Sequence, residues 1–283
     1  MAGDSSGLGS VALGLGSAAS WGAGDFVGGV ASQRAPALSV VVFSQGVGIV
    51  LLVSLALLMG EPPAAPGRLG WAALAGVNGA MGLLALYSAL ASGRMAIAAP
   101  VSGVVGAVVP VLVGMTIQGS PGPLRLAGFA LALAGVWLLA GGGAGSASPR
   151  ELLLPVVAGV SFGLFLVLIH WAGGDAGVLW PLSVARATSM GVLAAIGGVT
   201  RTLRLPRGSA RGLTGLAGVL DTGGNALFVL AAQAGRLDVA GVLSSLYPAA
   251  TVALAYVLLR ERLSQRQAIG AGATLAAIAC VSA

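Results

Sequence analysis

Three charged side chains stand inside long apolar runs of the sequence, where each needs a partner or a function. Asp25 lies in the first run, Arg186 in the seventh and Asp221 in the eighth. At the centre of a lipid bilayer a charged group costs at least about 2.5 to 3.5 kcal/mol on insertion scales. A buried carboxylate can carry a proton or bind a cation. Arg186 is a candidate for substrate binding, with snorkelling near the end of its span as the commoner alternative. The structural alternative is an aspartate that pairs with Arg186 or caps a helix break.

Each aspartate has a neighbour that shares its face of a helix. Trp21 precedes Asp25 by four residues, and Asn225 follows Asp221 by four. Side chains at this spacing lie one above the other on a helix. Trp21 is therefore a candidate for stacking on a ligand, with core packing as the alternative.

Further polar residues occur in other apolar runs. Tyr247 precedes Pro248, which removes a backbone donor and marks a hinge in a helix. Asn and Ser side chains also hydrogen-bond neighbouring membrane helices, and this is their commoner use. The candidate residues for substrate binding or coupling are Asp25, Asp221, Asn225, Trp21, Tyr247, Ser244, Asn78 and Arg186.

The composition requires a membrane protein. Of the 283 residues 57% are hydrophobic and only 8% are charged, with a mean hydropathy of +0.98. Soluble domains carry roughly 25% charged residues, so this chain cannot build a water-facing surface. The net charge of +6 comes from arginines placed between apolar runs, which is typical of loops at a membrane surface and excludes a nucleic-acid partner.

Ten apolar runs are long enough to cross a bilayer, which takes about 20 residues. A membrane barrel is excluded because apolar and polar residues do not alternate within them. The sequence therefore predicts an all-helical membrane protein with ten transmembrane helices. The runs lie near residues 8 to 30, 37 to 59, 69 to 92, 95 to 117, 122 to 141, 152 to 171, 178 to 200, 212 to 234, 238 to 259 and 264 to 282.

The two halves of the chain are similar. When the second half is aligned on the first, the segment from Leu86 to Arg94 falls on the segment from Phe228 to Arg236. Near the start of each half, Ser20-Trp21-Gly22 falls on Ser161-Phe162-Gly163. Five helices per half is an odd number, so the second half would be inverted in the membrane. Inverted repeats are a recurrent plan of secondary transporters, whose binding site lies between the halves near the midplane.

Two motifs resemble those of a known family. The string Ser20-Trp-Gly-Ala-Gly-Asp-Phe26 and the block from Gly235 through Pro248 to Glu261-Arg262 are similar to the EamA domains of the drug/metabolite transporter superfamily. The resemblance implies two tandem domains, residues 1–141 and 142–283, ten helices and solute transport. The halves depart from symmetry, because Gln118-Gly119 stands where the Glu-Arg pair would be and Phe162 replaces the tryptophan.

Other functions have weaker support. Gly22-Ala-Gly-Asp25 and Pro36-Ala-Leu38 match the short motifs of an intramembrane aspartyl protease, but their order along the chain is wrong. A scaffold without transport activity is a second alternative. A single histidine and a single cysteine cannot form a zinc site, and no nucleotide-binding motif is present, so we expect neither enzyme activity nor a cofactor.

The sequence thus predicts a multi-pass inner-membrane (plasma-membrane) carrier that exports or exchanges a small metabolite or drug-like solute. We expect alternating access, coupling to a proton or another cation, and lipid as the surrounding partner. Both termini should lie on the same face. Arginine bias places them outside, whereas the family's usual topology places them inside. The arginine-rich set of loops contains Arg34, Arg94, Arg150, Arg201, Arg204, Arg207, Arg211, Arg260, Arg262 and Arg266, against Arg68, Arg125 and Arg236 in the other.

Overall fold

The fold is a bundle of long helices. A computed structural model describes residues 3–91, 95–139, 149–173, 177–251, 254 and 264–282, and no strand occurs within these ranges. The helices are α1 (Gly3–Ser32), α2 (Ala37–Met59), α3 (Pro66–Ala91), α4 (Met95–Gln118), α5 (Pro123–Leu139), α6 (Pro149–Gly173), α7 (Leu179–Val199), α8 (Ser209–Ala234), α9 (Leu237–Ser244) and α11 (Gln265–Ser282).

Most of these helices have the length and apolarity that a bilayer demands. Among the described residues, six helices qualify as candidate membrane spans, namely α2, α3, α4, α6, α7 and α8. At 1.5 Å per residue, a span of 21 residues such as α7 measures about 31 Å, close to the thickness of the hydrocarbon core. Helices α5 and α11 carry shorter apolar stretches. The prediction of an all-helical membrane protein is confirmed, while the number of ten spans stays a prediction.

The expected ninth helix is divided. We predicted one helix from 238 to 259, but α9 ends at Ser244 and residues 245–246 form a turn before helical structure resumes at Tyr247. Pro248 explains the break, because its ring lacks an N–H and clashes with the carbonyl four residues earlier. That carbonyl belongs to Ser244. Residues 252–253 and 255–263, with the Glu261-Arg262 pair, lie outside the described residues.

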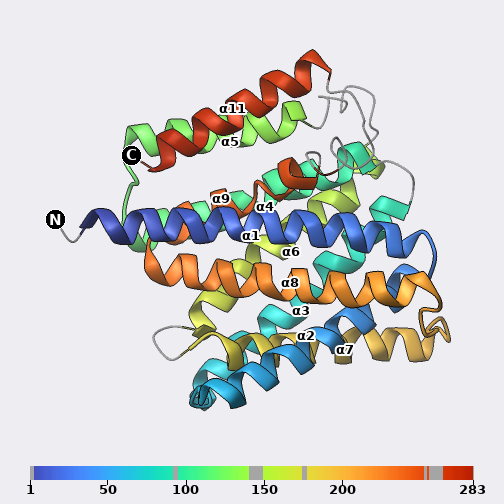
Figure 1. Cartoon of the computed structure of the whole chain (residues 1–283). Coiled ribbons are helices and arrows are strands. Elements are labelled where there is room, and N and C mark those ends of the chain that lie inside the picture. Colours follow the sequence, from blue (N-terminus) through green and yellow to red (C-terminus); the bar gives the residue numbers. More distant parts are fainter. Residues whose placement is uncertain are drawn as a thin grey trace.

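The helices pair across the two halves of the chain. Many of the extensive helix contacts cross between the halves, including those of α1 with α8, α3 with α6, α5 with α11 and α2 with α7. If the first five helices are exchanged with their equivalents in the second half, the α1–α8 pair becomes the α6–α3 pair, and the other two pairs map onto themselves. This pattern is that of an inverted repeat with a pseudo-two-fold axis. Figure 1 shows α5 and α11 side by side at one edge of the bundle.

The two ends of the bundle differ in charge. Helix α1 begins and α11 ends at the same end of the bundle, on the left in Figure 1, and we call this the terminal end. The opposite end carries the connections from α1 to α2 and from α7 to α8. We call it the basic end, because exposed arginines gather in those connections. They are Arg34, Arg201, Arg204 and Arg207, and the exposed Arg211 lies in the first turn of α8 at the same end.

Polar contacts tie the two repeats together at the terminal end. The Glu61 carboxylate, just after α2, accepts hydrogen bonds from the backbone N–H groups of Leu179 and Trp180 at 2.8 and 3.0 Å. It thereby caps the start of α7, where backbone donors lack partners within the helix. Arg68 donates to the Gly173 carbonyl at 2.9 Å, which joins α3 to α6. These contacts must break if the halves move apart at this end.

Candidate functional site

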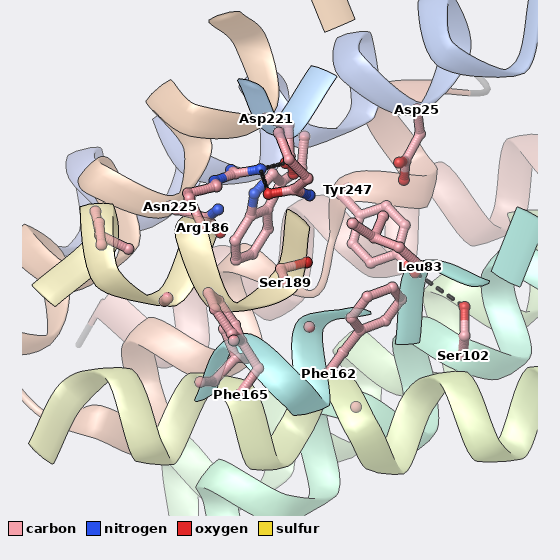
Figure 2. A pocket seen from close by; sticks show the side chains of 18 of the residues that line it. Asp25, Leu83, Ser102, Phe162, Phe165, Arg186, Ser189, Asp221, Asn225 and Tyr247 are labelled. Atoms are coloured by element: carbon pink, nitrogen blue, oxygen red, sulfur yellow. Dashed lines mark hydrogen bonds and ion pairs between the residues drawn. The ribbon is translucent and has the colours of Figure 1, made fainter. Parts of the chain in front are cut away.

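A cavity lies between the two repeats in the middle of the bundle. Its walls come from α1, α2, α3, α4, α6, α7 and α8 together with the turn after α9, so both halves build it (Figure 2). Its empty volume is about 800 Å³, including the space at its mouth.

Arg186 is the centre of the polar part of the cavity. Its Nη1 atom donates to Gln45 Oε1 of α2 at 2.8 Å and forms an ion pair with the Asp221 carboxylate of α8. The side chain of Arg186 is 5% exposed and that of Asp221 is 28% exposed. The arginine therefore links α7 to one helix of each repeat. This pairing is the structural alternative that the sequence left open for Asp221.

Two donors beside this ion pair have no partner. Within the described part of the chain, Arg186 Nη2 and Ser189 Oγ are buried and make no hydrogen bond. Both residues line the cavity from α7. Buried polar groups are satisfied in most proteins, and an exception calls for water, an ion or a ligand. An acceptor atom in the cavity would satisfy both donors.

Asp25 approaches the cavity from α1. Among the described residues it forms no ion pair and no hydrogen bond, although it lines the same cavity as Asp221. Figure 2 shows its carboxylate on the same side of the cavity as Tyr247, whose hydroxyl lies 3.0 Å from Ser102 Oγ. Asp25 is thus a carboxylate in the middle of the protein without a counter-ion from the described chain.

Aromatic rings lie on glycines at equivalent places in the two repeats. A Cβ atom on Gly224 of α8 would collide with the Trp21 ring of α1, and one on Gly82 of α3 would come within 2.6 Å of the Phe162 ring of α6. Trp21 aligns with Phe162 in the internal repeat, and Gly82 aligns with Gly224. Only the absence of a side chain lets each ring pack this closely against the opposite repeat. The replacement of tryptophan by Phe162 therefore preserves the contact.

We expect Gly224→Ala to displace the Trp21 ring and to weaken ligand binding, because the added methyl group takes the place of the indole edge. Overpacking of this kind costs about 1 to 3 kcal/mol. Gly215→Ala in the same helix is the matched control, since nothing lies within 4 Å of its added Cβ. Thermal melting of both purified variants measures the effect. Equal melting temperatures would contradict the contact.

The structure brings most of the predicted residues together. Trp21, Asp25, Arg186, Asp221, Asn225 and Tyr247 all line the cavity. Asn78 does not, and its Nδ2 atom donates to the Leu74 carbonyl of its own helix at 2.9 Å. Ser244 is fully buried next to α1, with its hydroxyl 3.4 Å from the Gly14 carbonyl.

The sequence analysis missed Gln45 and Ser189. A neutral amide and a hydroxyl in apolar runs gave no signal of their own, because such groups are common between membrane helices. The repeat does contain a signal, since the interval from Gln45 to Arg186 equals that from Trp21 to Phe162, which makes Gln45 and Arg186 equivalent positions. Two equivalent residues that touch must lie near the pseudo-two-fold axis.

Comparisons with known proteins agree with this architecture. The model of the EamA-like transporter family matches residues 8–141 and 149–283. A solved structure, titled only as a crystal structure of a protein, has a TM-score of 0.77 and 18% sequence identity, covering 96% of this chain and 95% of that chain. At this identity the likeness concerns the fold alone. No curated protein sequence matches the chain significantly.

Proposed function

The chain belongs to the EamA-like transporter family, and on this premise we propose that it exports or exchanges a small metabolite or drug-like solute. Membership makes it a multi-pass membrane transporter of the drug/metabolite type, and the family implies no enzyme activity. We propose alternating access as its mechanism, in which the cavity opens first to one side of the membrane and then to the other.

The position of the cavity supports this mechanism best. It lies where helices of two inverted repeats meet, and rocking of one repeat against the other exposes such a site to each face in turn. The contacts of Glu61 and Arg68 at the terminal end are those that such rocking must break. The break between α9 and Pro248 gives the cavity wall at Tyr247 a point of bending.

We further propose that Asp25 couples transport to a proton or another cation. An ionised carboxylate without a counter-ion is costly in the middle of a membrane, so Asp25 should carry a proton or a bound cation whenever the cavity is closed. The ionisable groups around it are Asp221, Arg186 and Tyr247. Asp221 is held by Arg186, which makes Asp25 the more available carboxylate.

The distribution of the exposed arginines supports one orientation in the membrane. We propose the bacterial inner membrane, or the plasma membrane in general, with the basic end in the cytoplasm. This orientation obeys the positive-inside rule and places both termini outside. The terminal end would then be the external gate.

Thiol labelling in proteoliposomes tests alternating access. Ser189→Cys, in a chain whose only cysteine has been replaced by Cys280→Ser, places a reporter in the cavity. We expect a membrane-impermeant thiol reagent to reach it from either face. Thr202→Cys at the basic end and Ala65→Cys at the terminal end are controls that should react from one face each. Reaction of the cavity cysteine from a single face under all conditions would contradict the mechanism and favour a scaffold.

A further inference from the structure

The two repeats build the cavity walls from equivalent positions with opposite polarity. On α1, Trp21 and Asp25 face the cavity, and their equivalents on α6 in the second repeat are Phe162 and Leu166. The aromatic position is kept in both repeats, whereas the carboxylate is replaced by a leucine. The internal repeat therefore preserves the shape of the wall while one side loses its charge.

The same exchange occurs between α8 and α3. Asp221 and Asn225 of α8 line the cavity, and their equivalents in the first repeat are Gly79 and Leu83 of α3, which line it as well. Helix α1 packs on α8, and α3 packs on α6. The polar residues therefore lie together on one helix pair, and their apolar equivalents lie together on the other. The α1–α8 side, which we call the polar wall, contributes both aspartates to the cavity. The α3–α6 side, which we call the apolar wall, contributes no charged residue to the cavity lining.

The apolar wall is continuous and rich in rings. Phe162, Phe165, Leu166 and Leu83 face the cavity there, and Figure 2 shows the two phenylalanines across the cavity from Asp221 and Asn225. A glycine at position 79 leaves room, because a Cβ there would come within 3.3 Å of the Phe165 ring. Such a surface gains free energy by removing an apolar group from water and does nothing for a wholly polar solute.

The polar wall has an excess of negative charge. Of the charged side chains lining the cavity, Asp25 and Asp221 are acidic and Arg186 is basic. The Arg186–Asp221 pair neutralises itself, which leaves the Asp25 carboxylate to attract a cation. Tyr247 and Trp21 line the cavity near it, and aromatic faces attract cations as well.

We propose that the solute is an organic amine with an apolar body. Its protonated nitrogen pairs with Asp25 on the polar wall, and its ring or alkyl chain lies against the apolar wall. A hydroxyl or carbonyl on the same molecule would satisfy the unpaired donors of Arg186 and Ser189. This proposal rests on the transport function proposed above and specifies its substrate class.

Three probes of nearly equal shape test the charge of the head group. They are 2-phenylethylamine, 2-phenylethanol and phenylacetate, which are positive, neutral and negative, and their dissociation constants are measured by calorimetry on the full-length protein in detergent. We expect the amine to bind about tenfold more tightly than either of the others, as for one charge-assisted contact in a buried site. Ethylamine, which lacks the ring, should bind more weakly than 2-phenylethylamine.

Two variants assign the contacts. Asp25→Asn should remove the preference for the amine, whereas Asp4→Asn, the same change near the start of α1, should leave it unchanged. Leu83→Asn places on the apolar wall the residue that its equivalent, Asn225, places on the polar wall. Leu83→Asn should weaken the binding of 2-phenylethylamine and leave the binding of ethylamine unchanged.

A chemical variant covers the case in which Asp25→Asn does not fold. Asp25→Cys, with Cys280→Ser, is treated with a thiol reagent that adds either a sulfonate or a trimethylammonium group. The sulfonate should restore the preference for the amine, and the trimethylammonium group should abolish binding of the amine. Equal results with both reagents would overturn the role of Asp25.

The outcomes separate the substrate class from the transport function. Equal or tighter binding of phenylacetate or 2-phenylethanol, or no binding of any probe, would overturn the amine proposal. In either case the labelling of Ser189→Cys still decides whether the protein is a transporter, because that experiment needs no substrate. Labelling from both faces together with failure of the amine probes would leave a transporter of another solute class.

Discussion

Asp221→Ala will destabilise the folded protein more than any other single change in the cavity. The substitution leaves the Arg186 guanidinium buried and charged, with the Gln45 amide as its one remaining hydrogen-bond partner among the described residues. Breaking a buried ion pair by removing one partner costs about 3 to 5 kcal/mol, because the remaining charge has lost both water and counter-ion. The partial exposure of Asp221 places the expected loss near the lower end of that range. Unfolding of the purified protein by a denaturing detergent measures it.

A second substitution provides the control for this result. Arg186→Gln introduces the amide that its equivalent Gln45 already has. It also removes the buried charge that Asp221→Ala leaves without a counter-ion. We therefore expect the double variant to be more stable than Asp221→Ala alone, with the cycle giving the coupling energy of the pair. Additive losses in the two single variants would mean that the ion pair does not stabilise the fold.

Gly76→Ala should have the second largest effect, because α3 and α7 touch at this residue. A Cβ atom on Gly76 would overlap the backbone carbonyl oxygen of Ala185, and a backbone atom cannot rotate out of the way as a side chain can. The two helices must separate or shift along each other. We expect a loss near the upper end of the range of about 1 to 3 kcal/mol for overpacking.

Gly70→Ala isolates this steric effect from helix propensity. Gly70 lies in the same helix, and nothing is found within 4 Å of an added Cβ there. Alanine favours a helix over glycine by up to about 1 kcal/mol, so Gly70→Ala should leave the melting temperature unchanged or raise it. If Gly76→Ala behaved in the same way, the close approach of α3 to α7 would be refuted.

The sequence was a good guide to whatever depends on local pattern. Apolar runs predicted the helices, and the positions of Asp25, Arg186 and Asp221 predicted where charge would lie in the bundle. Contacts between side chains far apart in the sequence were harder to predict. Gln45 has no charge and no polar neighbour at helical spacing, so its role appears only when Arg186 is placed beside it by the fold. Asn78 looked equivalent in kind, yet it bonds to its own helix.

The break after α9 shows a different limit. Pro248 was recognised as a hinge, but the apolar run continued on both sides of it, and hydropathy carries no information on backbone geometry. The missing donor and the ring clash at Ser244 divided the helix. The contacts of Trp21 and Phe162 with glycines could not be predicted either. The residues around a glycine in the sequence do not indicate which distant ring packs against it.

The pairing of helices across the halves has a consequence for biosynthesis. Helices α1 and α3 leave the ribosome well before α8 and α6, the helices that will cover them. Until then lipid or the insertion machinery must shield those faces, and the Asp25 carboxyl group enters the membrane before the rest of the cavity has formed. The guanidinium of Arg186 is without its counter-ion for a shorter time, because Asp221 follows it on the next helix along the chain. The charges of Arg186 and Asp221 can thus enter the bilayer as a neutral pair on two consecutive helices.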